Sequence, residues 1–156
     1  MAIAKGQKAP PFSLYDSDKN KVSLEDLKGK NILILFFPLA FTRVCTAELC
    51  DIRDNMTIYN NTNAQVLGIS VDSLYVLNKF KAEQHLNFPL LSDFNKEASR
   101  AFDVLYEDFS FGMKGVSKRA AFILDKEGII QYAEECANAA DLPDFKAIRT
   151  ILENLN

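Results

Sequence analysis

Residues 31–45 read NILILFFPLAFTRVC, an apolar run that meets a proline at Pro38 and then reaches a cysteine, Cys45. The run over 31–37 is rich in β-branched and large apolar side chains, as expected of a buried parallel strand. A helix is predicted from about Ala47 onward, and Cys45 falls in its first turn. Unpaired backbone N–H groups and the positive end of the helix dipole stabilise an anion there. Because the thiolate is the reactive form of cysteine, this position favours a nucleophilic role for Cys45.

The sequence on either side of this segment predicts one α/β domain that spans residues 1–156. The expected strands cover residues 12–15, 21–24, 31–37, 65–71, 88–91, 120–124 and 129–133. The expected helices cover residues 45–59, 74–86, 95–102 and a final segment that opens at Pro143. Strands that alternate with helices predict a central mixed sheet with helices on both faces, preceded here by an N-terminal β-hairpin. Ligands of such sheets bind beyond the carboxyl ends of the strands, which is where Cys45 lies.

Composition and charge argue against several classes of function. The chain has 156 residues, of which 48% are hydrophobic, and a formal net charge of −3. Because there is no basic stripe, nucleic acid and anionic membranes are not expected partners. The start of the chain lacks the apolar region of a signal peptide, and no window approaches roughly eighteen uninterrupted apolar residues. We therefore expect a cytoplasmic protein.

The cysteines indicate free thiols. Cys45, Cys50 and Cys136 are an odd number of cysteines in a chain without a secretory signal. This argues for a reducing compartment and against a permanent disulfide framework. A zinc site needs about four ligands. With a single histidine and a Cys45-x4-Cys50 spacing the chain offers a poor set, so no metal is expected.

The residues around Cys45 resemble the active-site pattern of the peroxiredoxin family, which here reads Pro38-x3-Thr42-x2-Cys45. Residues 36–45 look like the alkyl hydroperoxide reductase E branch, except that Arg43 stands where this branch usually has a small residue. Further landmarks follow in the family's order: Gly6-x2-Ala9-Pro10-x-Phe12, then Phe88-Pro89-Leu90-Leu91-Ser92-Asp93, then Arg119-x2-Phe122-Ile123-x-Asp125-x2-Gly128. The resemblance covers nearly the whole chain and implies a thioredoxin-like fold.

The same resemblance implies a thiol-dependent peroxidase without metal or organic cofactor. Cys45 would attack one oxygen of hydrogen peroxide, an organic hydroperoxide or peroxynitrite and become a sulfenic acid. The Thr42 hydroxyl would lie between the sulfur and the peroxide, and Thr42 is also expected to cap the helix. Pro38 would shield the sulfenic acid, while Arg119 would hold the thiolate and polarise the peroxide. Glu48 matches an acidic position that orients the arginine in this branch.

The route that reduces the sulfenic acid stays open among three candidates. Cys50 is favoured, because the Cys-x4-Cys spacing matches the bacterioferritin-comigratory branch, in which the second cysteine is the resolving one. Along an intact helix, however, the two α-carbons are about 8–9 Å apart, beyond the roughly 7 Å reach of a disulfide, so the helix start would have to unwind. An external thiol, either thioredoxin or a low-molecular-weight thiol, is the second candidate, and Cys136 is the third. The family likeness also implies a homodimer.

Two other functions and two local features also stay open. A redox sensor or holdase-like protein would use Cys45 as a switch. A thioredoxin-like disulfide reductase is disfavoured, because Thr42 occupies the place of the first cysteine in a Cys-x2-Cys motif. Arg43 adds a cation that could favour the thiolate further or narrow the pocket. The Phe-rich segment 109–113 could be loop packing, a border of the substrate pocket or a subunit interface.

Overall fold

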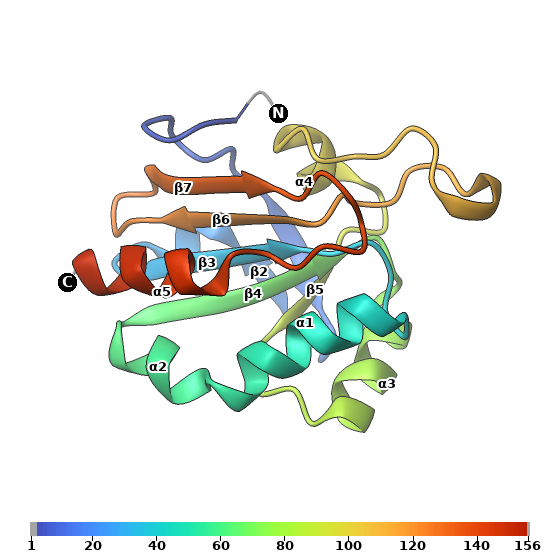
Figure 1. Cartoon of the computed structure of the whole chain (residues 1–156), viewed down its shortest axis with the longest axis horizontal. Coiled ribbons are helices and arrows are strands. Elements are labelled where there is room, and N and C mark those ends of the chain that lie inside the picture. Colours follow the sequence, from blue (N-terminus) through green and yellow to red (C-terminus); the bar gives the residue numbers. More distant parts are fainter. Residues whose placement is uncertain (1–2, 156) are drawn as a thin grey trace.

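The computed structural model describes residues 3–155, which contain one seven-stranded sheet in the order β2-β1-β5-β4-β3-β6-β7 (Figure 1). The strands are β1 (Ser13–Asp16), β2 (Lys21–Ser23), β3 (Asn31–Phe36), β4 (Ala64–Ser70), β5 (Leu90–Ser92), β6 (Ala120–Leu124) and β7 (Ile130–Glu135). The α-helices are α1 (Arg43–Asp54), α2 (Met56–Asn61), α3 (Leu74–Gln84), α4 (Glu97–Ala101) and α5 (Phe145–Asn154). Short 3₁₀ turns form η1 (Leu24–Leu27) and η2 (Ser110–Gly112). Parallel and antiparallel pairs coexist in the sheet, as predicted.

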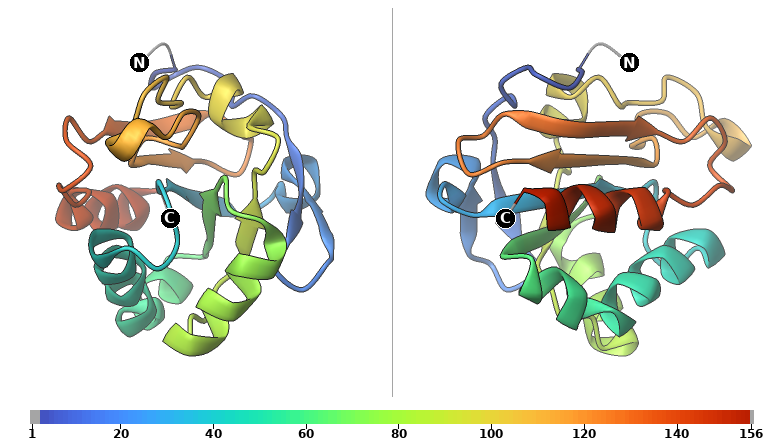
Figure 2. Two further views of the ribbon diagram at one scale, coloured as in Figure 1. Left: turned by 90° about the vertical axis from the view of Figure 1, so that its right-hand side faces the viewer. Right: turned by 60° about the vertical axis from the view of Figure 1, so that its left-hand side comes forward.

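β3 is buried along its whole length, and its alternating side chains enter two separate cores. Leu33 and Leu35 belong to the cluster that includes residues of α1, α3 and α5. Ile34 and Phe36 belong to the opposite cluster, which includes Phe102 at the end of α4. This alternation is the period of two that a strand imposes on its side chains. Figure 2 shows α1, α2, α3 and α5 on one side of the sheet and α4 on the other, so the expectation of helices on both faces is confirmed.

The topology of the sheet brings Arg119 to the end of β3. β6 runs antiparallel to β3, and Ala120 at its start pairs with Phe36 at the end of β3. The chain therefore enters β6 at the same end of the sheet at which it leaves β3. Arg119 immediately precedes β6, so it lies next to the turn that leads from β3 into α1. No local feature of the sequence reports this proximity.

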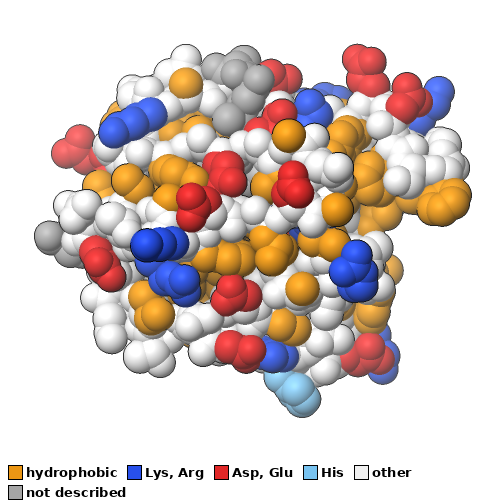
Figure 3. Space-filling view, viewed as in Figure 1, with side chains coloured by type: hydrophobic (Ala, Val, Ile, Leu, Met, Phe, Trp, Pro, Cys, Tyr) orange, Lys and Arg blue, Asp and Glu red, His pale blue; other side chains and the backbone are white. Residues whose placement is uncertain are grey.

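The N-terminal hairpin extends the sheet, as predicted. β1 pairs with β2 and, on its other side, with β5, both antiparallel. Acidic and basic side chains are interspersed over the face shown in Figure 3, without a patch of one sign. Within residues 3–155, no helix combines the length and the apolar character needed to cross a membrane.

Several helix boundaries differ from the predictions: α3 ends at Gln84 rather than near Leu86, α4 covers Glu97–Ala101 rather than 95–102, and the first and last helices also differ. The expected helix over 45–59 begins earlier, at Arg43, and is broken into α1 and α2 at Asn55, whose φ of −114° and ψ of 19° are not helical. The Asn55 side chain donates to the backbone oxygen and the carboxylate of Asp51, and such local bonds compete with the helix. The last helix begins at Phe145 rather than at Pro143, because Asp144 caps it by accepting from the Ala147 N–H.

Candidate active site

A hollow of about 310 Å³ opens at the carboxyl end of β3, and we call it the Cys45 hollow. It is lined by residues 38–39, 42–45, 109–110 and 138–140 together with Arg119. The four residues for which the sequence predicts catalytic roles, Cys45, Thr42, Arg119 and Pro38, therefore share one cavity. Segment 138–140 was not singled out in the sequence, because its small and polar residues carry no chemical signature.

The Cys45 sulfur lies beside a buried guanidinium. Cys45 is the third residue of α1, and its side chain is almost fully buried. The Nη2 of Arg119 donates to Cys45 Sγ at 3.2 Å, and its Nη1 donates to Glu48 Oε1 at 2.6 Å. Nε and Nη2 of Arg119 also donate to the backbone oxygen of Ala139. The planar fork of arginine thus has fixed partners on three sides, which holds one N–H at the sulfur.

Glu48 is fully buried one helical turn after Cys45. Burial raises the pKa of Glu48 to about 7, because the loss of solvation outweighs the attraction of Arg119. Burial also works against the charge of Arg119, yet Glu48 and Cys45 raise the pKa of Arg119 further above its ordinary value. Glu48 Oε2 accepts no hydrogen bond from the residues that the structure describes. The guanidinium therefore stays charged, whereas Glu48 can change its protonation near neutral pH.

Thr42 and Pro38 lie on the turn between β3 and α1. Thr42 occupies the N-cap position of α1, but its hydroxyl donates to the backbone oxygen of Leu39 at 2.7 Å and makes no cap bond. The expectation that Thr42 is the N-cap residue of this helix is confirmed, although its side chain makes no cap bond. With its proton committed to Leu39, the Thr42 hydroxyl keeps its lone pairs to accept from a ligand. Pro38 is buried, and the exposed Arg43 lines the hollow.

The other two cysteines do not line the Cys45 hollow, and all three thiols are free. Cys50 is partly buried on α1, and its thiol donates to Gln84 Oε1 of α3 at 3.5 Å. Cys136 follows β7, where its backbone N–H donates to the Arg119 carbonyl at 2.9 Å. Burial raises the pKa of Cys136 to about 12, so its thiol stays protonated and is a poor nucleophile.

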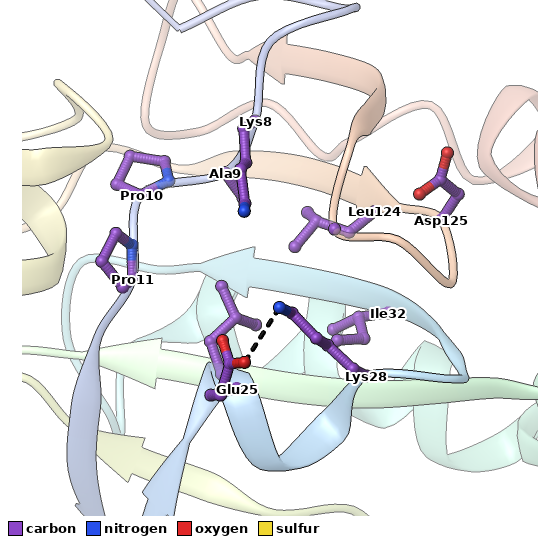
Figure 4. A pocket seen from close by; sticks show the side chains of 11 residues that line it. Lys8, Ala9, Pro10, Pro11, Glu25, Lys28, Ile32, Leu124 and Asp125 are labelled. Carbon is purple, nitrogen blue, oxygen red and sulfur yellow. Dashed lines mark hydrogen bonds and ion pairs between the residues drawn. The ribbon is translucent and has the colours of Figure 1, made fainter.

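A second hollow, of about 430 Å³, lies at the other end of the sheet (Figure 4). It is lined by residues 8–11, by Ile32 near the start of β3 and by Leu124 at the end of β6. An ion pair of 2.9 Å between Lys28 and Glu25 borders it. Its lining contains no cysteine, so of these two hollows the smaller one is lined by a thiol. Among residues 3–155, no three histidine, cysteine or carboxylate side chains lie close enough to hold a metal ion.

Comparison with known proteins agrees with this geometry. Residues 5–133 match the AhpC/TSA family. Alkyl hydroperoxide reductase E of Mycobacterium bovis is 37% identical over 132 residues, which are 83% of each chain. The structure of Xanthomonas campestris bacterioferritin comigratory protein, described with its alkyl peroxide reduction activity, is similar with a TM-score of 0.82 and 28% identity. That match covers 92% of this chain and 90% of the other.

A second solved structure supports the fold alone. Peroxidoxin BcpB from Mycobacterium tuberculosis is similar with a TM-score of 0.88 and 24% identity, and the match covers 99% of each chain. Its likeness confirms the predicted thioredoxin-like fold. With the cysteine, the guanidinium and the surrounding turn in place, the chain belongs to the AhpC/TSA family and is a peroxiredoxin, a thiol-dependent peroxidase.

Proposed function

We propose that Cys45 is the sulfur that attacks the peroxide and that Thr42, Pro38 and Arg119 form the peroxide site around it. The observation that carries this proposal is the 3.2 Å contact between Arg119 Nη2 and Cys45 Sγ. The thiolate attacks one oxygen of the hydroperoxide, so an S–O bond forms while the O–O bond breaks. The other oxygen leaves with the electron pair and takes a proton to become water or an alcohol. Cys45 is left as a sulfenic acid.

The charge of Arg119 supports both ends of this step. Negative charge moves from the sulfur onto the leaving oxygen, and a fixed cation beside the sulfur stabilises both distributions without reorienting. Glu48 and the Ala139 carbonyl hold the guanidinium, so we assign Glu48 as a positioning residue. The Thr42 hydroxyl accepts a hydrogen bond from a protonated peroxide oxygen.

We propose Cys50 as the thiol that resolves the sulfenic acid, with thioredoxin or a low-molecular-weight thiol as the final reductant. Cys45 and Cys50 lie on the same intact helix, and Cys50 contacts Gln84 rather than the hollow. Their α-carbons are about 8–9 Å apart on such a helix, so the first turns of α1 must unwind before a disulfide forms. Cys136 is disfavoured, because its thiol stays protonated. Free thiols also fit a reducing compartment such as the cytoplasm.

We further propose that the protein forms a homodimer through the end of the sheet next to which Cys45 lies. Three large apolar side chains follow the carboxyl ends of β3, β4 and β5, which are parallel: Phe41, Tyr75 and Phe94, exposed by 50%, 70% and 61%. Phe111 is fully exposed on the protruding loop between α4 and β6, seen at the right of Figures 1 and 3. Large apolar side chains exposed at one end of the sheet are typical of a surface that a partner covers.

Replacement of Arg119 by Met tests the central contact. We expect Arg119→Met to slow the oxidation of Cys45 by hydrogen peroxide roughly 100-fold, because one fixed donor at the reacting atoms is lost. Arg119→Lys keeps the positive charge but lacks the planar guanidinium, so we expect a smaller decrease in this rate. Single-turnover loss of the free Cys45 thiol measures both rates, and Arg100→Met, on the exposed face of α4, is the control. An unchanged rate in Arg119→Met would contradict the proposed site.

Intact mass after one equivalent of peroxide identifies the resolving thiol. We expect the wild type and Cys136→Ser to lose two hydrogens, because a disulfide forms as water leaves. Cys50→Ser should instead gain one oxygen, since the sulfenic acid then has no partner. If the loss of two hydrogens is absent only in Cys136→Ser, the resolving thiol is Cys136 rather than Cys50. Gain of one oxygen in the wild type would indicate resolution by an external thiol.

Glu48→Gln tests the buried carboxyl group through the pH dependence of stability. Because the pKa of Glu48 rises from 4.5 to about 7 on folding, the folded protein keeps a proton that the unfolded chain releases between these values. This contribution to the free energy of unfolding is therefore present below about pH 4.5 and is lost as the pH rises through about 7.

Urea denaturation at about pH 4 and about pH 8 compares the two proteins. The stability of Glu48→Gln relative to the wild type should increase between these two pH values, because glutamine has no proton to lose. A difference that stays constant would show that Glu48 does not titrate in this range.

Sedimentation velocity tests the homodimer. We expect the wild type to sediment as a dimer and the double variant Phe94→Ser, Phe111→Ser to shift toward the monomer. Lys30→Ser is the control, because Lys30 is also exposed but directly precedes β3, at the opposite end of the sheet. A wild type that sediments as a monomer, or a double variant that remains dimeric, would rule out this interface.

A further inference from the structure

The turn between β3 and α1 is tied to the rest of the molecule by a carboxylate that lies outside the Cys45 hollow. Asp72 follows the end of β4, and its Oδ2 accepts from the backbone N–H of Ala40 at 2.8 Å. The same oxygen accepts from the Ser70 hydroxyl at 2.6 Å. The backbone oxygen of Asp72 accepts from the Ser92 hydroxyl at 2.7 Å. Asp72 therefore joins the carboxyl ends of β3, β4 and β5 by hydrogen bonds.

The backbone of this turn is in a conformation that its sequence does not favour. Phe41 has a φ of +66°, a left-handed conformation that a bulky L side chain rarely adopts. Its ring packs against Phe80 of α3 with a centroid separation of 5.1 Å. The Thr42 hydroxyl bonds back to the Leu39 carbonyl within the turn itself. An unfavourable local conformation persists only where neighbouring contacts hold it, and the bond from Ala40 to Asp72 is such a contact.

The same turn carries two of the residues assigned to the peroxide site. Pro38 lies two residues before Ala40 and Thr42 two residues after it, so the anchored N–H lies midway between them. A displacement of the turn would move both side chains relative to Cys45, whose own position is fixed on α1 and by Arg119. Loss of alignment of about 1 Å can cost roughly 100-fold in rate even when no reacting group is removed.

We propose that Asp72 is a positioning residue that holds the turn over residues 38–42 in the conformation that serves peroxide reduction. It acts through Ala40 and touches neither the sulfur nor the peroxide. The inference rests on the proposed roles of Thr42 and Pro38. Release of the bond from Ala40 to Asp72 also frees the segment that precedes α1.

Two reactions of Cys45, measured separately, distinguish a positioning role of Asp72 from a general loss of structure. Peroxide reduction needs Thr42 and Pro38 in register with the sulfur, whereas alkylation by iodoacetamide needs only an accessible thiolate. The ratio of the two second-order rate constants therefore reports the alignment of the turn. It is measured in a Cys50→Ser, Cys136→Ser background, in which Cys45 is the remaining thiol.

In that background, Asp72→Ala should lower the ratio of the peroxide rate to the alkylation rate by roughly tenfold or more. Asp72→Asn retains an oxygen that can accept from both Ala40 and Ser70, so its ratio should stay within about threefold of the parent. Ser73→Ala removes the neighbouring N-cap of α3, which accepts from Val76, and should leave the ratio unchanged. If Asp72→Ala does not fold, Ser70→Ala should lower the ratio in the same direction by a smaller factor.

An unchanged ratio in Asp72→Ala would overturn the proposal. So would a loss in Asp72→Asn as large as that in Asp72→Ala, because it would point to the charge of Asp72 rather than to its bond with Ala40. Failure of the underlying assignment of Cys45 is distinguishable. In that case the parent background itself would consume peroxide no faster than free cysteine, whatever residue stands at position 72.

Discussion

The candidate site is organised around the contact between the Arg119 guanidinium and the Cys45 sulfur. Several parts of the surrounding structure hold this contact in place. A cation that is only 2% exposed is costly unless each of its donors finds a partner. Glu48 and the Ala139 carbonyl satisfy the donors that do not face the sulfur. They hold the guanidinium still, so that one N–H of Nη2 points at Cys45. The Cys45 sulfur and the buried ion pair are thus parts of one arrangement rather than two separate features.

The sheet makes this contact possible. Because β6 is antiparallel to β3, its first residues lie beside the last residues of β3, so that Cys45 and Arg119 become neighbours although they are 74 residues apart in sequence. β4 and β5 run parallel to β3 and end at the same edge, which places Asp72 and Ser92 behind the turn. The site is therefore assembled from the ends of four strands. Its chemistry is set by short loops on a buried and rigid support.

Much of this organisation could be predicted from local patterns. The apolar run over 31–37 and the periodicity after it place Cys45 near the start of a helix, and the structure has it as the third residue of α1. The break at Asn55 could not be foreseen, because it depends on bonds from the Asn55 side chain to Asp51 rather than on the apolar period. The Thr42 hydroxyl could either accept from a backbone N–H of α1, as a helix cap, or donate to a carbonyl within its own turn. It donates to the Leu39 carbonyl.

The long-range contacts lie beyond such patterns. Arg119 could be assigned to the site only through the family likeness, since its distance in sequence from Cys45 says nothing of contact. The bond from Ala40 to Asp72 joins a backbone N–H to a carboxylate 32 residues away. Since nearly every residue has a backbone N–H, the sequence does not indicate which one a carboxylate will bind. The burial of Glu48 likewise depends on which face of α1 meets Arg119, since a glutamate is almost never fully buried unless it is paired. Contacts of this kind follow from the topology of the sheet.

The most direct test of the claim that Cys45 is an activated sulfur is the rate at which the reduced Cys50→Ser, Cys136→Ser protein consumes hydrogen peroxide, compared with free cysteine at the same pH. If the guanidinium and the turn activate and align the sulfur, the protein should react at least about 100-fold faster. A rate equal to that of free cysteine would contradict a peroxidase site and would favour a protein that uses Cys45 only as a redox switch.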